Sequence, residues 1–174
     1  GFRQQSGASL NVNYLLWEHP GDLAHVGEPM RERLQTLYDA KGMGPIATPH
    51  GSSSTIDSEH LAVLMETKPE MASFHFGLPD QGVIREMKEA GIFVVCSATT
   101  VVEALALEAG GADAVIAQGT EAGGHRGTFS KVDISMQAGL FALLPQVVDA
   151  VSVPVIAAGG IADGRSAGVG GGGD

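Results

Sequence analysis

Short apolar runs alternate with helix-like segments along the chain, and this alternation limits the fold more than any other feature of the sequence. Five runs are typical of strands and begin near residues 10, 71, 92, 114 and 153. Segments with helical spacing separate them, as in repeated βαβ units. The pattern predicts a parallel α/β sheet whose strands are joined by helical crossovers.

Helical spacing and capping residues predict five helices, over residues 30–38, 58–65, 81–90, 101–109 and 134–151. Thr100 followed by Glu103 has the spacing of a capping box, which strengthens the start of the fourth helix. Pro145 lies inside the last one and is expected to kink or divide it, because proline removes a helical hydrogen bond.

Charge and cysteine content exclude several classes of protein. The chain has 174 residues, which suits one domain with a real core. Its net charge of −10 and scattered basic residues argue against binding nucleic acid or an anionic membrane. Its single cysteine, Cys96, fits a reducing compartment. No apolar stretch reaches the roughly 18 residues of a membrane span, so we expect a soluble, cytoplasmic protein.

The segment from Gly111 to Phe129 combines a buried strand with a glycine-rich loop. Residues 114–117 are apolar, as expected of a strand that is covered on both faces. The loop that follows contains four glycines and one imidazole, that of His125. In (β/α) barrels the chemistry lies on the loops after the strands. We therefore expect His125 to project from a functional loop.

Several segments together resemble the nitronate monooxygenase family, formerly called 2-nitropropane dioxygenases. They are LNVN at 10–13, SFHFGLP at 73–79, SATTVVEA at 97–104, GADAVIAQGTEAGGHRGTF at 111–129 and PQVVDAVSVPVIAAGGIADGR at 145–165. The resemblance implies an FMN-dependent TIM (β/α)8 barrel, of which this chain has about five βα units. The family's first βα unit and the units after residue 165 have no counterpart here, so the chain resembles an internal fragment.

Two domain-level expectations follow from this resemblance. Residues 1–165 would form a partial FMN-binding (β/α) barrel, with unpaired strands at both edges. Residues 166–174 read SAGVGGGGD, which is typical of a flexible glycine-rich tail.

The resemblance also implies which residues bind FMN. Asn13 and Gln118 match positions whose amides hydrogen-bond the flavin. Gly123 and Gly160 match backbone contacts to FMN, and Gly159 with Gly160 precedes a helix start where phosphate could bind. The alternatives are a turn-forming asparagine, a solvated glutamine and a simple strand-to-helix turn.

His125 matches the family's catalytic base. A neutral imidazole can take the α proton of a nitroalkane, and FMN would then be the redox partner in a reaction of the nitronate with dioxygen that releases a carbonyl compound and nitrite. Without the motif, a structural or surface role for this histidine would be the better interpretation.

Other polar residues have weaker signals. Ser73 and His75 alternate with phenylalanines, so His75 either lines the active site or is a hydrogen-bonded structural residue. Arg126 could attract an anionic substrate or the FMN phosphate, or form a surface salt bridge. Glu121 would shape the loop or contact solvent.

Cys96 lies in an apolar strand and is expected to be an inert core thiol. We expect no metal site, because four histidines lack metal-ligand spacing and read as surface residues: His19, His25, His50 and His60.

Three functions remain open at the level of sequence. The first is oxidation of a small nitronate or nitroalkane by dioxygen. The second is an FMN-dependent NAD(P)H:quinone or enoyl-carrier-protein reductase of the same superfamily. The third is a truncated product without catalysis. A homo-oligomer is compatible with each of them.

Overall fold

The computed structural model describes residues 5–17, 27–46, 55–130, 133, 135 and 137–166. The chain divides into two compact units, one formed by Gly1–Leu16 with Thr55–Asp174 and the other by Trp17–Ser54. The described part of the second unit includes helix α2 (Glu28–Ala40), which has Pro29 in its first turn as predicted. Among the described residues, no helix is long and apolar enough to span a membrane.

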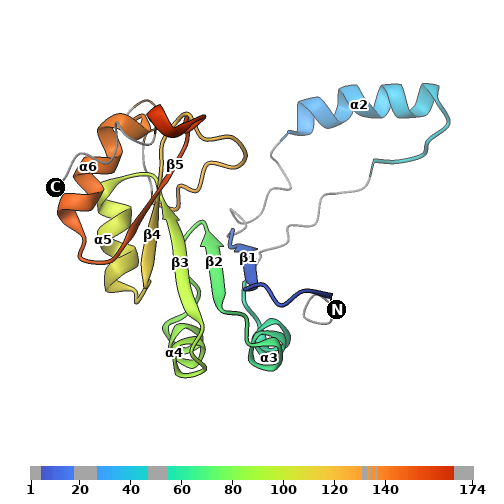
Figure 1. Cartoon of the computed structure of the whole chain (residues 1–174). Coiled ribbons are helices and arrows are strands. Elements are labelled where there is room, and N and C mark those ends of the chain that lie inside the picture. Colours follow the sequence, from blue (N-terminus) through green and yellow to red (C-terminus); the bar gives the residue numbers. More distant parts are fainter. Residues whose placement is uncertain are drawn as a thin grey trace. The chain divides into compact units, whose positions relative to one another are not determined.

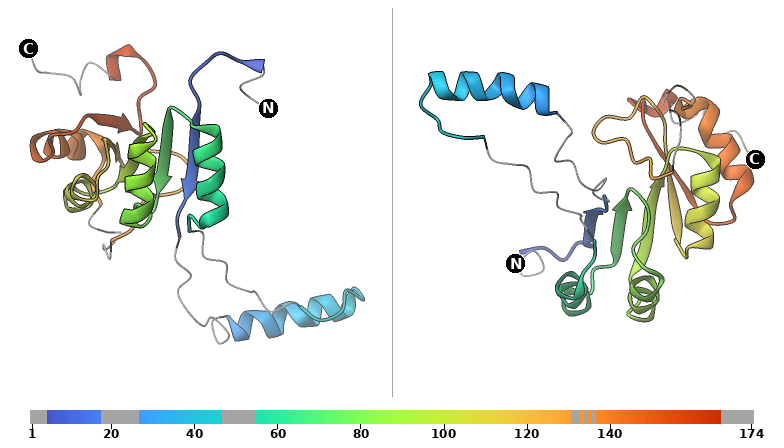
Figure 2. Two further views of the ribbon diagram at one scale, coloured as in Figure 1. Left: turned by 90° about the horizontal axis from the view of Figure 1, so that it is seen from below. Right: turned by 180° about the vertical axis from the view of Figure 1, so that it is seen from behind.

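The first unit contains a five-stranded sheet in which all neighbouring pairs are parallel (Figure 1). The strand order follows the sequence, and Figure 2 shows the same succession from two further directions. The strands are β1 (Asn11–Leu15), β2 (Met71–His75), β3 (Phe93–Ala98), β4 (Ala114–Gln118) and β5 (Val155–Ala158). This order confirms the predicted parallel α/β sheet with its five strands.

Four helices of this unit connect the strands: α3 (Ser58–Thr67), α4 (Gln81–Glu89), α5 (Val101–Ala109) and α6 (Leu140–Ala150). Asp57 caps α3 by accepting hydrogen bonds from the backbone N–H groups of Glu59 and His60. Thr100 caps α5 by accepting one from the N–H of Glu103. The cap at Thr100 was predicted from the sequence.

The prediction for the last helix was wrong at its N-terminus. Helix α6 begins at Leu140 rather than near residue 134. Gly139 is extended, with φ −67° and ψ 160°, and the N–H of Leu140 donates to the Glu121 carboxylate at 2.8 Å. Pro145 lies inside α6 without dividing it. The helix therefore starts where a carboxylate from the loop after β4 caps it.

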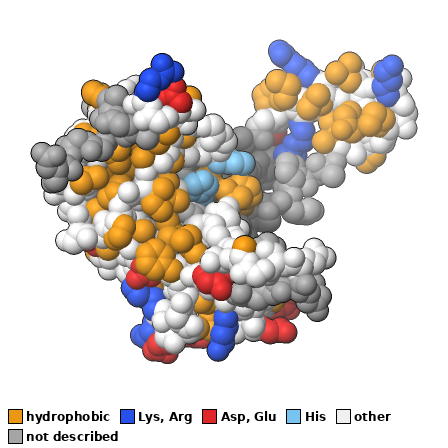
Figure 3. Space-filling model, in the orientation of Figure 1, with side chains coloured by type: hydrophobic (Ala, Val, Ile, Leu, Met, Phe, Trp, Pro, Cys, Tyr) orange, Lys and Arg blue, Asp and Glu red, His pale blue; other side chains and the backbone are white. Residues whose placement is uncertain are grey.

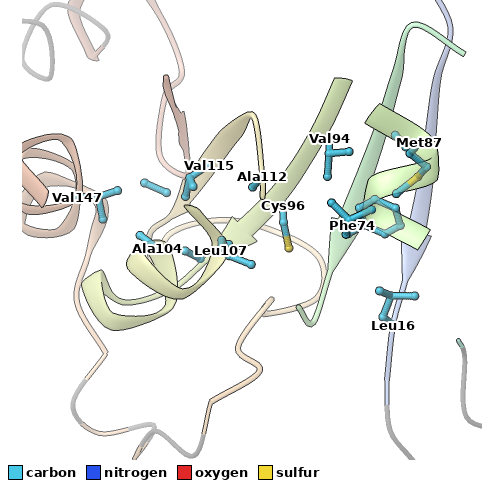
Figure 4. Packing of buried hydrophobic residues seen from close by; sticks show 14 of the residues in the cluster. Leu16, Phe74, Met87, Val94, Cys96, Ala104, Leu107, Ala112, Val115 and Val147 are labelled. Carbon is cyan, nitrogen blue, oxygen red and sulfur yellow. The ribbon is translucent and has the colours of Figure 1, made fainter. Parts of the chain in front are cut away.

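Alternate strand residues pack against the helices and form the core (Figure 4). Phe74, Val94, Cys96 and Val115 point to this side and are fully buried. Burial raises the pKa of the Cys96 thiol to about 12, which agrees with an inert core cysteine. The intervening residues form the opposite side of the sheet, called the open face below: Asn11, Asn13, Leu15, Met71, Ser73, His75, Phe93, Val95, Ser97, Ala114, Ile116, Gln118, Ile156 and Ala158. Unlike the core side, the open face mixes polar and apolar side chains.

Candidate active site

A short row of polar side chains crosses the open face between β1 and β2. The Asn11 amide donates to the Ser73 hydroxyl, which donates to the Asn13 amide oxygen, both at 3.0 Å. Asn13 pairs in register with Ser73 and is exposed on this face. The side-chain nitrogen of Asn13 thus belongs to a polar surface that a ligand could reach.

Gln118, at the end of β4, holds the loop that follows it. Its side-chain nitrogen donates to the carbonyl of His125 at 2.8 Å, and its oxygen accepts from the N–H of Gly127 at 2.7 Å. Gln118 is buried, so it is not the solvated residue of the alternative interpretation. Its amide fixes the loop backbone on both sides of Arg126.

His125 is exposed on this loop, as predicted. Its ring lies 6.3 Å from the ring of Phe76, which in turn lies 6.1 Å from the ring of His75. Phe76 has a φ of 69°, an uncommon conformation for a non-glycine residue. Histidine side chains reach the surface beside hydrophobic ones in Figure 3. The structure thus brings both histidines to the carboxyl ends of β2 and β4.

His75 lies on the open face of β2, partly covered by the loop. Burial lowers the pKa of His75 below its ordinary value of 6.5, and His125 lowers it further. Its Nδ1 is buried without a hydrogen-bond partner, as is the hydroxyl of Ser97. A Cβ added to Gly127 would lie 3.4 Å from that Nδ1 and 3.1 Å from the Ser97 Cβ, so the loop can cover these side chains because residue 127 is glycine.

Arg126 points into the protein and makes hydrogen bonds that neither sequence interpretation included. Its Nε donates to the side-chain oxygen of Gln137 at 2.6 Å. Its Nη1 donates to the carbonyls of Gln118 and Gly119. Arg126 therefore joins the end of β4 to the segment before α6 and stabilises the loop from within.

Glu103 binds the loop after β4 in a way that the sequence did not indicate. Glu103 is 1% exposed, and its carboxylate accepts hydrogen bonds from the N–H and hydroxyl of Thr99, both at 2.7 Å. It also accepts from the N–H of Phe129 and from the N–H and hydroxyl of Ser130, at 2.7–3.0 Å. In a capping box this carboxylate would bind the N–H of Thr100. The only sequence signal was a glutamate in the first turn of α5.

These bonds imply a pH-dependent contribution of Glu103 to stability. Burial alone raises its pKa, but hydrogen bonds from Ser130 and Thr99 outweigh burial and hold the pKa below its ordinary value of 4.5. A carboxylate whose pKa is lower in the folded state than in the unfolded state stabilises the fold at pH values above the unfolded-state pKa. This contribution is lost as the pH falls through the folded-state pKa.

We predict that Glu103→Gln lowers the free energy of unfolding at neutral pH, and that the gap to wild type narrows below the ordinary pKa of 4.5. Urea unfolding of both proteins from about pH 7 to about pH 3 measures this gap. A gap that widened on acidification would contradict the assignment.

Glu121 and the surrounding glycines set the shape of the other half of the loop. The Glu121 carboxylate accepts from the N–H of Leu140, and this bond lowers its pKa. A Cβ on Gly119 would lie 2.4 Å from Glu121 Oε2 and 2.5 Å from the Leu140 nitrogen. A Cβ on Gly139 would lie 2.6 Å from Glu121 Oε1. Glu121 is exposed and its carboxylate also shapes the loop, so the structure shows both of the roles suggested for it.

We predict that Gly119→Ala destabilises the chain by about 1–3 kcal/mol, because the added methyl overpacks the capped start of α6. Gly123→Ala is the matched control, since nothing lies within 4 Å of a Cβ at that position. Thermal unfolding of both variants measures the difference between their losses of stability. Equal losses in the two variants would contradict the packing described for Gly119.

The turn after β5 contains Gly159 and Gly160, with φ values of 123° and 67°. A Cβ on Gly159 would lie 2.9 Å from the backbone nitrogen of Ala122, so this turn packs closely on the loop after β4. Gly123 and Gly160 are exposed. Gly159 and Gly160 thus lie beside the loop that carries His125. Asn13 lies on β1, at the opposite edge of the sheet from β5.

Of the four histidines expected at the surface, the structure describes His60. His60 is exposed on α3, and its Nδ1 lies 2.7 Å from the Asp57 carboxylate. His19, His25 and His50 lie outside the described residues. Within the described ranges, no group of three or more His, Cys, Asp or Glu side chains is placed to hold a metal ion.

Comparison with known proteins identifies the family. The family model described as nitronate monooxygenase matches residues 30–168. A nitronate monooxygenase from Paraburkholderia phytofirmans is 49% identical over 160 residues, which is 92% of this chain and 40% of the relative. The chain therefore spans less than half the length of this relative.

Solved structures show the same fold. The nitroalkane oxidase of Streptomyces ansochromogenes matches with a TM-score of 0.76 and 39% identity, over 89% of this chain and 44% of that one. FabK of Thermotoga maritima matches with a TM-score of 0.61 and 28% identity, over 97% of this chain and 39% of that one. The five βα units correspond to part of a TIM barrel. This chain belongs to the nitronate monooxygenase family.

Proposed function

We propose that this chain forms part of an FMN-dependent enzyme that oxidises alkyl nitronates, and nitroalkanes after their deprotonation, with dioxygen to carbonyl compounds and nitrite. The observation that carries the proposal is the place of His125 on the loop after β4, where Gln118 holds its carbonyl. Active sites of (β/α) barrels lie at this end of the strands. Family membership supplies the reaction class.

The open face has features that suit a flavin. Asn13 is exposed there, and Gly123 has open space where a side chain would be. Buried polar atoms of His75 and Ser97 lack protein partners on the same face. An isoalloxazine ring combines apolar surface with hydrogen-bonding atoms at its edge, which suits a mixed surface of this kind.

In this proposal, Asn13, Gln118, Gly123, Gly159 and Gly160 hold the FMN. When bound, FMN supplies the electron acceptor for substrate oxidation. Gln118 contributes mainly by holding the loop, because both ends of its amide already bind loop backbone. Gly160 is exposed in the turn after β5, and both Gly159 and Gly160 have positive φ values that favour glycine.

His125 would act as the base that takes the α proton from a neutral nitroalkane. Its exposed position allows a small substrate to reach the imidazole. A neutral imidazole is available near physiological pH and favours the resulting anion once it is protonated. A nitronate has already lost this proton, so its oxidation does not need the base.

Oxygen uptake by the FMN-supplemented chain tests the reaction. We expect uptake with propyl nitronate that depends on FMN and forms nitrite in parallel. NADH is the comparison substrate, because a quinone or enoyl-carrier-protein reductase would oxidise it readily. NADH oxidation without nitronate-dependent uptake would replace our proposal by the reductase, and no turnover of either would favour the inactive product.

A further inference from the structure

Glu103 is a buried carboxylate that the proposed reaction does not use, yet it binds the far end of the His125 loop. Its Oε1 accepts from the N–H of Phe129 and from both donors of Ser130. Its Oε2 accepts from both donors of Thr99. An ionised carboxylate only accepts hydrogen bonds, so it suits a site where every neighbour is a donor.

A chain of side-chain hydrogen bonds joins this carboxylate to the other end of the loop. Arg126 donates to Gln137 at 2.6 Å, and Gln137 donates to the Thr128 hydroxyl at 2.8 Å. The hydroxyls of Thr128 and Thr99 lie 2.9 Å apart, and Thr99 donates to Glu103. Because Thr99 uses its proton toward the carboxylate, Thr128 must donate to Thr99. Every donor in the chain therefore points toward Glu103.

The His125 loop is thus held at two places. Gln118 binds the backbone at residues 125 and 127, and Glu103 binds it at residues 129 and 130. Gln118 belongs to β4, whereas Glu103 belongs to α5, so the two anchors come from different elements. The imidazole projects from the backbone that Gln118 binds. Glu103 holds the following part of the loop, at residues 129 and 130, against α5.

We propose that Glu103 is a positioning residue for His125, whose carboxylate fixes residues 128–130 and so orients the imidazole toward the open face. The catalytic part of this inference rests on the proposed role of His125. The structural part, fixation of the loop, stands separately and has its own measurement.

Hydrogen exchange of the loop amides tests the fixation. Glu103→Gln replaces one acceptor oxygen by a donor group that faces donors, and a buried donor without a partner is costly. We expect the amides of Phe129 and Ser130 to exchange at least about tenfold faster than in wild type. Unchanged protection at these amides would overturn the proposal.

Glu108→Gln is the matched control. It makes the same chemical change on the same helix, but the Glu108 carboxylate accepts from the N–H groups of Ser152 and Val153. Glu108→Gln should speed amide exchange at Ser152 and Val153 and leave Phe129 and Ser130 unchanged. If Glu103→Gln fails to fold, Ser130→Ala removes a single donor to the carboxylate and should still speed exchange at Phe129. No change there would equally overturn the proposal.

Turnover separates positioning from general destabilisation. We expect Glu103→Gln to lower nitroalkane turnover about tenfold or more and nitronate turnover much less. Combining it with His125→Ala should add no further loss of nitroalkane turnover. Parallel losses with both substrates would overturn the positioning role. If wild type turns over neither substrate, the proposed function fails, while the exchange experiment still decides whether Glu103 fixes the loop.

Discussion

Replacing His125 by alanine is expected to lower kcat/KM for a neutral nitroalkane by about 10²–10⁴-fold. The imidazole is exposed on the loop after β4, and the α proton of a nitroalkane must be removed before oxidation. Turnover of the corresponding nitronate should be nearly unchanged, because that substrate arrives deprotonated. Oxygen-electrode assays with both substrates measure the two effects.

His60→Ala is the control for loss of an exposed histidine. His60 lies on α3, on the side of the sheet opposite the open face, and is paired with Asp57. Its replacement should leave turnover of both substrates as in wild type. Equal loss of nitronate and nitroalkane turnover in His125→Ala would indicate a binding or structural role and exclude the base.

The second large effect is on stability. Phe74→Ala is expected to lower the free energy of unfolding by about 3–5 kcal/mol. Phe74 is fully buried in the core, where its ring stacks on Tyr14 at 5.9 Å, and truncation leaves a cavity between the sheet and the helices. Because small domains are stable by only about 5–15 kcal/mol, this loss is a large fraction of the total.

Phe141→Ala makes the same substitution at a position where the ring is 75% exposed on α6. We expect it to cost less than about 1 kcal/mol, because little surface leaves water on folding. Urea unfolding of both variants measures the contrast. A cost for Phe141 that matched the cost for Phe74 would mean that the core is not where the structure places it.

The strands could be predicted because their signal is local. Apolar runs between glycines, such as residues 114–117, are typical of parallel strands covered on both sides. The start of α6 could not be predicted in this way, because its cap is Glu121, which lies 19 residues earlier in the chain. Apolar spacing over 134–139 suggested helix, and a tertiary hydrogen bond determined the boundary.

The same distinction separates the two kinds of site residue. His125 stands out in sequence because an imidazole within a glycine-rich loop is a local pattern. The internal roles of Arg126 and Glu103 depend on partners far along the chain, since Phe129 lies 26 positions after Glu103. Such contacts leave no periodic signal, so an arginine in the loop resembled an anion-binding residue and a glutamate in a helix resembled a cap.

The most direct test of the central claim is an FMN titration of the purified chain, followed by flavin fluorescence or absorbance. Our account places a flavin on the open face and its flanking loops, and it predicts saturable binding of one FMN per chain that Gly160→Trp weakens. A cooperatively folded chain that left the flavin spectrum unchanged across the titration would contradict it.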